Sequence, residues 1–214
     1  MKKITFAIAT LFISTAAMAQ QITIDPEVGL NFGKIRTKIS DNSSESDDNK
    51  TGLRIGAGVN IGLSQGFYVK PGLYYGNKGS QTSSNTLGDY KTSLHYLELP
   101  VNLGYQYKIN GGKAGGIFAE AGPYIAYAIS GKYKGDNIPV IGSTETDIEF
   151  GSGTTETNAF DWGFNFGGGY ESPWGVYLKA QYGLGLGNLS NVDDVKSNNC
   201  LLYTSDAADE GLGV

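Results

Sequence analysis

A stretch of strict two-residue alternation, HYLELPVNLGYQY at residues 95–107, constrains this chain more than any other feature. After His95, every odd-numbered position carries Leu, Val or Tyr, whereas the even-numbered positions include Glu98 and Asn102 and no aliphatic side chain other than proline. Successive side chains of a β-strand point to opposite faces, so this strand has one apolar and one polar face. A strand of about 9–11 residues with this polarity and with aromatics at its end is typical of a transmembrane β-barrel.

The composition also favours strands. The 214 residues include 32 Gly and 14 Tyr but only 6 Pro. Glycine disfavours a helix by roughly 1 kcal/mol per position relative to alanine, whereas it lets neighbouring strands curve and approach closely. Beyond the N-terminus no run of about 18 apolar residues occurs, so the sequence offers no transmembrane helix.

The same alternation recurs at residues 26–37, 51–63, 67–77, 116–129, 158–170 and 176–186. Long polar segments at 38–50, 78–93, 130–157 and 188–199 alternate with short turns, as external loops and periplasmic turns do in bacterial barrels. We therefore predict an all-β, antiparallel up-and-down transmembrane β-barrel. Residues 138–141 (IPVI) are expected to form a short hairpin arm. Pro71 and Pro100 are expected to cause bulges or kinks, because each proline removes a donor from the strand ladder.

The first 19 residues have the organisation of a secretory signal peptide. Lys2 and Lys3 precede an apolar run at residues 4–13, and AMA at 17–19 is a small-residue cleavage site. The apolar run is too short for a membrane anchor. We therefore expect export, with a mature chain that begins at Gln20.

The other end of the chain departs from the alternation. Single-chain bacterial barrels have an even number of strands, and seven are recognisable here, so we expect eight strands with the last one missing. After Asn199 the sequence reads CLLYTSDAADEGLGV, which contains the only Cys. Codons can be chosen for residues 200–210 that spell the transposase adapter of short-read sequencing libraries. We therefore expect a truncated barrel domain at residues 20–199 and an artefactual tail at 200–214. The alternative is a genuine disordered tail. In that case, source DNA amplified across the codon for Asn199 encodes residues 200–214.

Four segments together resemble the PorT-like porin family of small outer-membrane barrels from Bacteroidota. They are FYVKPGLYYGNKG at 67–79, HYLELPVNLGYQY at 95–107, EAGPYIAYAISG at 120–131 and FDWGFNFGGGYE at 160–171. The resemblance covers roughly residues 20–199, and its most specific part is YLELP at 96–100. It implies an eight-stranded outer-membrane barrel and little about activity. The missing last strand, which in the family carries a terminal aromatic for the barrel-insertion machinery, is a departure.

The polar face of the predicted strands carries charges that must pair inside a barrel. An eight-stranded barrel has an interior just wide enough for side chains to fill. We expect two ion-pair layers, one near the external half and one near the periplasmic half. The external layer would contain Arg54, Glu98 and Asp161, and the periplasmic layer Glu27, Lys70, Glu120 and Lys179. Two interpretations are open: a gate along a narrow ion path, or a salt-bridge core that only holds the barrel closed.

Aromatic residues gather at the predicted strand ends. Tyr105, Tyr107, Tyr170 and Trp174 lie at the periplasmic ends, and Tyr75 and Trp162 lie nearer the external ends. Aromatic girdles at both membrane interfaces are expected of this fold. A stacking platform for an aromatic ligand is the alternative.

The sequence offers little catalytic or metal chemistry. His95 is the only histidine, and it falls on the lipid-side parity, so interfacial packing is the expected role. No His, Cys and acidic residues have metal-ligand spacing, and the acidic run at 45–48 lacks the fixed glycine of a calcium loop. We expect no cofactor and no metal. The formal net charge of −5 gives no basic excess for nucleic acid.

Four functions fit these observations to different degrees. The first is a non-enzymatic outer-membrane barrel with a plugged lumen and surface-exposed loops. The second is a narrow channel or porin for small solutes or ions. An outer-membrane enzyme would need a Ser, His and acid set near the rim, and a soluble ligand-binding barrel would place the dense aromatic face inside. Expected partners are outer-membrane lipid, the barrel-insertion machinery and an extracellular partner of the loops, and the expected state is a monomer.

Overall fold

The alternating segments form long antiparallel strands in the computed structural model, which describes residues 22–39, 43–46, 48–84, 88–138, 142–151, 157–188, 195–208 and 210–211. The predicted signal peptide lies outside these residues. Eight strands are long: β1 (Ile22–Ile39), β3 (Asp48–Gly62), β4 (Phe67–Ser84), β5 (Gly88–Lys108), β6 (Gly116–Ile138), β8 (Phe160–Glu171), β9 (Val176–Gly185) and β10 (Val195–Ala208). Shorter elements are β2 (Ser43–Ser46), β7 (Gly142–Asp147), β11 (Glu210–Gly211) and the 3-10 turn η1 (Ile109–Gly112).

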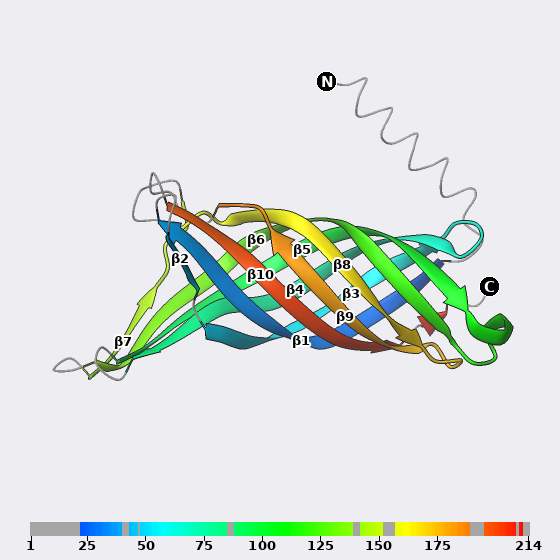
Figure 1. Ribbon diagram of the computed structural model, residues 1–214, viewed down its shortest axis with the longest axis horizontal. Coiled ribbons are helices and arrows are strands. Elements are labelled where there is room, and N and C mark those ends of the chain that lie inside the picture. The colour runs from blue at the N-terminus through cyan, green and yellow to red at the C-terminus, as the bar shows by residue number, and fades with distance from the viewer. Residues whose placement is uncertain are drawn as a thin grey trace, which may run out of the picture.

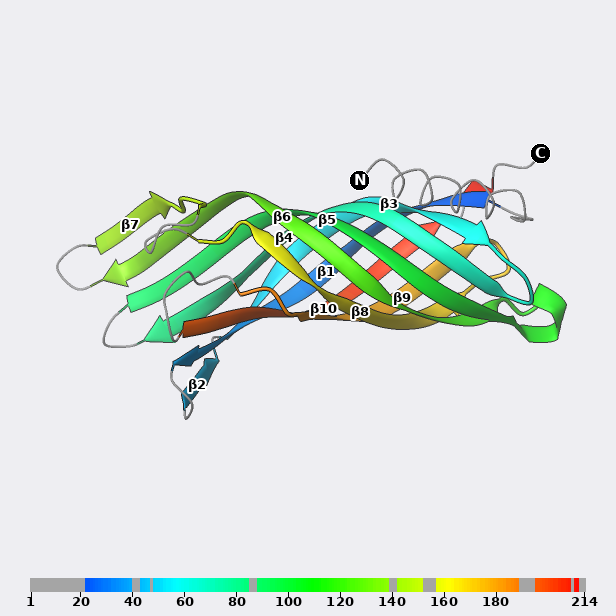
Figure 2. The ribbon, with the colours of Figure 1, turned by 90° about the horizontal axis from the view of Figure 1, so that it is seen from above.

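The eight long strands close into a ring. Each pairs antiparallel with the next along the chain, and β10 pairs with both β9 and β1. Figures 1 and 2 show the strands wound steeply around one common axis. Closure leaves the ring without a free edge, as a membrane interior requires. The predicted fold class, an antiparallel up-and-down β-barrel, is confirmed. No helix in the described ranges is long and apolar enough to cross a membrane.

The predicted division of faces is also confirmed. On β5, Leu99 is 50% exposed on the outside of the ring, whereas its neighbour Glu98 is 3% exposed inside. The same reversal runs along β8 and β9, where exposed and buried residues alternate. Side chains alternate between the two faces of a strand with a period of two. Once one apolar residue of a strand faces outward, all the apolar residues at that spacing face outward, and the polar residues between them face into the barrel.

Several strands are longer than the apolar pattern predicts. Residues 78–84 and 88–93 were expected in an external loop but continue β4 and β5, and residues 130–138 continue β6. In these extensions, backbone hydrogen bonds between neighbouring strands form regardless of the side chains. A strand that continues with polar residues is therefore not recognised from apolar alternation in the sequence. Beyond them, β6 and β7 form a hairpin in which Ile138 pairs with Gly142. Residues 139–141 of the expected IPVI arm lie outside the described residues.

The prolines do not produce the expected bulges. Pairing between β4 and β5 lapses after Pro71 and resumes at Tyr74 in the same register. Pairing between β5 and β6 likewise lapses after Pro100 and resumes unchanged at Leu103. The register shifts lie elsewhere: between His95 and Tyr96 in the β5–β6 ladder, between residues 49 and 54 in the β3–β4 ladder, and between residues 135 and 138 in the β6–β7 ladder.

The expectation that the eighth strand is missing is wrong for this chain. Residues 195–208 form β10, which includes part of the tail expected to be artefactual. Tyr203 and Ser205 are buried on its inner side, and Leu202 is exposed on its outer side. Asp206 is also exposed on the outer side, in register with Val28 and Leu178. A charged residue there is unfavourable in lipid, so β10 follows the barrel pattern less well than the other strands. The origin of residues 200–214 stays a prediction.

Three tight connections gather at one end of the ring, here called the turn end. They are residues 63–66, 109–115 and 172–175. Gly66 and Gly175 adopt φ values of 88° and 82°, a conformation that glycine enters without a steric penalty. The opposite end, here called the loop end, carries the strand extensions and the β6–β7 hairpin (Figure 1).

Candidate functional site

The interior of the barrel is the best-organised polar site in the described chain. Side chains from all eight long strands converge there, because each strand turns its polar parity inward. The interior has three parts along the barrel axis. These are a vestibule at the turn end, a buried ion-pair network in the middle, and an apolar cap toward the loop end.

Glu27 on β1 is the centre of the ion-pair network. Its carboxylate lies 2.8 Å from Nζ of Lys179 on β9 and 2.9 Å from Nζ of Lys70 on β4. Lys179 also reaches Oε1 of Glu120 on β6, at 3.1 Å, and Lys70 reaches Oδ2 of Asp25, at 2.7 Å. Two lysines therefore tie three carboxylates together across the lumen.

Arg54 on β3 extends the network toward the loop end. Its Nη1 lies 3.4 Å from Glu27, and its Nη2 lies 3.2 Å from Glu98 on β5. Lys78 then joins Oε2 of Glu98, at 3.0 Å, to Oδ2 of Asp161 on β8, at 3.8 Å. The expected two separate layers are therefore wrong. The long guanidinium side chain of Arg54 spans both halves, and the charges form one continuous network.

The structure places all the residues predicted for the interior within this network, and each is no more than 5% exposed. Sequence reasoning missed Lys78 and Asp25. Lys78 continues the inward parity of Lys70 and Tyr74, but it was assigned to a loop because the outward residues beside it are not apolar. Asp25 precedes the residue at which the first strand was expected to begin.

Buried tyrosines donate further hydrogen bonds to the carboxylates of the ion-pair network. Tyr74 and Tyr177 donate to Oε1 of Glu27, at 3.0 and 2.7 Å. Tyr68 donates to Glu120 at 3.2 Å, and Tyr203 donates to Glu98 at 3.1 Å. A carboxylate accepts several hydrogen bonds, so these hydroxyls offset part of the desolvation of the buried charge.

The guanidinium of Arg54 also packs on an aromatic face. Its Cζ lies 3.5 Å from the centre of the Tyr74 ring, a cation–π arrangement. The network holds four cations (Arg54, Lys70, Lys78 and Lys179) and five carboxylates (Asp25, Glu27, Glu98, Glu120 and Asp161). Buried charges that are paired and hydrogen-bonded in this way hold strands of the ring in fixed positions relative to one another.

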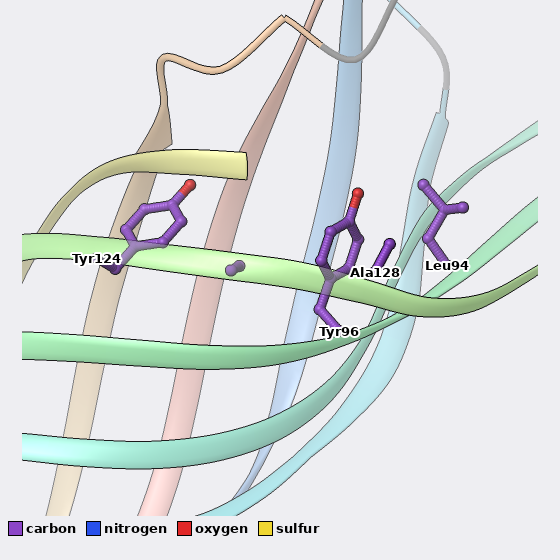
Figure 3. Packing of buried hydrophobic residues seen from close by; sticks show 5 residues of the cluster. Leu94, Tyr96, Tyr124 and Ala128 are labelled. Carbon is purple, nitrogen blue, oxygen red and sulfur yellow. The ribbon is translucent and has the colours of Figure 1, made fainter. Parts of the chain in front are cut away.

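An apolar cap lies beyond the network toward the loop end. Leu94 and Tyr96 on β5 pack with Tyr124, Ala126 and Ala128 on β6, as Figure 3 shows for the labelled members. The segment after β7 returns to cover this cluster with three partly buried residues, Ile148, Phe150 and Ala159. The return is fixed by hydrogen bonds from the amide of Ile148 to the Gly131 carbonyl and from the amide of Ala128 to the Ala159 carbonyl.

Sequence reasoning missed this return, because residues 130–157 were assigned to a polar external loop. The available signal was the apolar pair Ile148 and Phe150 inside an otherwise polar segment. Gly131 makes the return possible. A Cβ at this position would lie 2.8 Å from a Leu94 methyl and 3.0 Å from the Phe150 ring.

The vestibule opens at the turn end. Its volume is about 590 Å³, and polar side chains from several strands line it, including Asn60, Gln106 and Glu171. Gln106 donates a hydrogen bond of 2.8 Å to Glu171. Further in, the space shrinks to about 10 Å³ beside Lys70 and Tyr177. The ion-pair network thus closes the vestibule from within.

The predicted interface aromatics lie on the outer surface. Tyr105, Tyr107 and Tyr170 are 43–57% exposed near the turn end, and Trp174, in a turn, is 86% exposed. Trp162 is 45% exposed nearer the loop end. Their position at the membrane interfaces remains a prediction.

His95 lies on the outer side, where its Nδ1 is 2.7 Å from the Tyr75 hydroxyl and the two rings are stacked. Within the described ranges, no group of three His, Cys, Asp or Glu residues could hold a metal ion. The interior acids and bases bind one another, so the chemistry they carry out in this arrangement is charge pairing.

Comparison with known families explains this architecture. Residues 18–191 match the model of a family described as an outer membrane protein beta-barrel domain. The chain belongs to this family. It is therefore a small β-barrel protein of the bacterial outer membrane.

Solved structures of similar fold include other small outer-membrane barrels. Neisserial surface protein A is 14% identical with a TM-score of 0.50, and the match covers 87% of this chain and 95% of that one. Ail from Yersinia pestis is 12% identical with a TM-score of 0.35, covering 86% and 97%. At these sequence identities, the similarity to both proteins concerns the fold alone. No curated protein matches the sequence.

Proposed function

We propose that this outer-membrane barrel is a non-enzymatic protein whose lumen is plugged and whose contacts are made by its surface-exposed loop end. The observation that carries the proposal is the continuous chain of buried ion pairs from Glu120 through Lys179, Glu27, Arg54 and Glu98 to Lys78. Every charge on this path has an opposite charge within 3.4 Å. An entering ion would have to displace such a pair, which leaves its partner buried and uncompensated.

The apolar cap supports the same proposal. It lies on the loop-end side of the network, and Ile148 and Phe150 cover it. An ion that crossed the network would therefore meet a second region lined by apolar side chains, where the nearby charge is the Lys78 ammonium, 4.9 Å from the centre of the Tyr96 ring. Two consecutive obstacles of opposite chemistry favour a closed lumen.

Within its family, we place the protein in the PorT-like porin group on the four segments quoted above. The proposed partners are outer-membrane lipid around the barrel, the insertion machinery that recognises the last strand, and an extracellular molecule at the loop end. The closed ring, whose edges are all paired, favours a monomer.

Liposome swelling tests the proposal. The full chain, reconstituted in vesicles and shown to be folded by heat-modifiable migration on a detergent gel, is expected to admit no small sugar or amino acid. A vesicle population that swells in proportion to the folded protein would overturn it. A protein that is not heat-modifiable would instead contradict the membrane barrel itself.

The second candidate function is a narrow channel for small solutes or ions. Two observations favour it: the polar vestibule, and buried amides at Asn31, Asn165 and Gln181 that make no hydrogen bond among the described residues. Such amides are suited to bind water. Swelling or conductance that changes when Gln181→Leu is introduced would favour this function over the plugged scaffold.

A further inference from the structure

The outer face of the barrel carries a group of lysines just beyond its apolar band. Lys91 on β5 and Lys134 on β6 are direct cross-strand partners, and Lys132 lies opposite Ser93 in the same ladder. Lys132 and Lys134 have about half of their side chains exposed. Like charges placed directly opposite each other destabilise a sheet. Such a pair is favourable only where negative charge lies close to it.

Lys50 on β3 adds a fourth ammonium to this group. Its Nζ donates to the Thr92 carbonyl, at 3.0 Å, and to the Ser93 hydroxyl. To reach β5 it crosses β4 over Gly79, where a Cβ would lie 3.2 Å from its Cδ. Lys50 is thus anchored beside Lys91, and the strands β3, β5 and β6 present lysines on one outward surface, with β4 between β3 and β5. Lys50, Lys91, Lys132 and Lys134 are called the lysine belt below.

The belt lies where the apolar band ends. On the outer face the last large apolar residues below it are Tyr75 on β4, Leu97 on β5 and Ile129 on β6, each at least 37% exposed. His95 and Ser93 follow Leu97 along β5 toward the loop end, and Lys91 comes next on the same face. In a membrane the apolar residues lie in hydrocarbon, so the belt lies at the depth of the lipid headgroups.

Acidic residues neutralise only part of the belt. Glu145 on β7 lies 2.6 Å from Lys132 and 2.7 Å from Lys134, and Asp147 lies 4.0 Å from Lys132. Asp89 and Asp136 face each other two pairs beyond Lys91 and Lys134 in the same ladder. Among the described residues, no carboxylate lies within salt-bridge distance of Lys50 or Lys91, so the β3–β5 half of the belt is the part open to an external anion.

We propose that the lysine belt binds the phosphate groups of phosphorylated lipids in the outer leaflet. An ammonium binds phosphate as a compact point charge with several donors. Lysines near a membrane surface contribute about 1 kcal/mol each toward anionic lipid, which is about five-fold in affinity. Phosphate between Lys91 and Lys134 also removes the like-charge repulsion across the β5–β6 ladder. The proposal depends on the loop end facing outward, and it is independent of whether the lumen conducts.

Native mass spectrometry of the full chain, extracted from vesicles of mixed lipids, tests this. The vesicles contain a bis-phosphorylated glycolipid of the outer-leaflet type and its dephosphorylated form in equal amounts. The unmodified protein is expected to retain the phosphorylated lipid in preference, and raising the salt is expected to reduce that preference. Equal retention of the two lipids would overturn the proposal without changing the result of the swelling assay.

Matched variants locate the site. Lys91→Gln is expected to lower retention of the phosphorylated lipid about five-fold, and Lys91→Arg is expected to keep it. Lys113→Gln, which makes the same charge change at the turn end, serves as the control and is expected to bind like the unmodified protein. The same loss in Lys91→Gln and Lys113→Gln, or no loss in Lys91→Gln, would contradict the assignment. If Lys91→Gln is not heat-modifiable, Lys50→Gln provides the same test.

Discussion

The ammonium of Lys179 lies 2.8 Å from the carboxylate of Glu27, although the two residues are 152 positions apart in the chain. β10 separates their strands in the ring, and Lys179 also contacts Glu120 on the far side, across β8. A single lysine thus joins three strands that are not neighbours. The network therefore acts on the closure of the barrel as well as on its lumen.

Removal of Glu27 is expected to be strongly destabilising. Glu27→Ala leaves Lys70, Lys179 and one side of Arg54 without their carboxylate, and breaking a buried pair costs about 3–5 kcal/mol. Urea unfolding of the barrel in vesicles, followed by tryptophan fluorescence, measures the change in the free energy of unfolding. Glu149→Ala, at an exposed position, is the control and is expected to stay close to the unmodified protein. An unchanged midpoint in Glu27→Ala would contradict the buried network.

Glu120 and Lys179 are expected to be energetically coupled. Glu120→Gln alone leaves Lys179 with Glu27, whereas Lys179→Met alone leaves both carboxylates short of a cation. The double variant should therefore lose less stability than the two single changes added together, with a coupling energy of about 0.5–3 kcal/mol. The same unfolding assay on all four proteins measures it. Strict additivity would show that the contact contributes nothing.

The exposed hairpin provides a pH-dependent contact. Hydrogen bonds from Lys132 and Lys134 lower the pKa of Glu145 from 4.5 to about 2. Because the pKa is lower in the folded hairpin, the contact is complete above pH 4.5 and is lost as the pH falls through about 2. Carbon-detected NMR titration of the Glu145 carboxyl checks this. Lys132→Gln should move its pKa back toward 4.5, and a pKa near 4.5 in the unmodified protein would disprove the contact.

The apolar cap is expected to shield the inside of the loop end. With Cys200→Ser as background, a thiol introduced by Ala128→Cys should react slowly with a membrane-impermeant maleimide, because Ala128 is buried beneath the returning segment. Adding Gly131→Val should speed labelling, since the new side chain meets Leu94 and Phe150. Thr144→Val, at an exposed position of β7, controls for general disturbance. Fast labelling of Ala128→Cys alone would show that the cap is open.

The assignment of β10 as the eighth strand can be tested with one substitution on each of its faces. Asp206 points outward between Val28 and Leu178, so Asp206→Leu should stabilise the barrel by about 2 kcal/mol in vesicles. Ser205 is buried inside, and Ser205→Leu should destabilise it through overpacking. The unfolding assay measures both changes. The opposite order of stabilities would mean that residues 195–208 do not form the eighth strand in this register.

The alternation predicted most of the interior because a strand's period of two is fixed by its backbone. Once Leu97 and Leu99 are outside, Glu98 must be inside, and the same reasoning places Arg54, Lys70, Glu120 and Lys179. The pattern could not show which charges meet. The contact between Arg54 and Glu27 depends on strand register and on the length of the arginine side chain, and both are properties of the closed ring.

The missed features share a physical cause. Lys78 lies where β4 extends past the apolar band, so its outward neighbours are not apolar. Ile148 and Phe150 are held against the apolar cap by tertiary contacts and not by a regular strand pattern. None of the three residues therefore lies in a segment of apolar alternation. The strand β10 carries Asp206 on its outer face, which breaks the pattern used to recognise strands. Sequence periodicity therefore predicts the membrane-embedded part of this barrel well and its ends poorly.

Single-channel recording in a planar bilayer tests the central claim most directly. The folded full chain is expected to show no steady conductance, because the buried network and the apolar cap close the lumen in series. A steady conductance that changes with Lys70→Ala or Glu120→Ala would contradict the plugged lumen and show that these charges line an ion path. A barrel that is verified as folded in the same preparation and shows no conductance has the closed lumen described above.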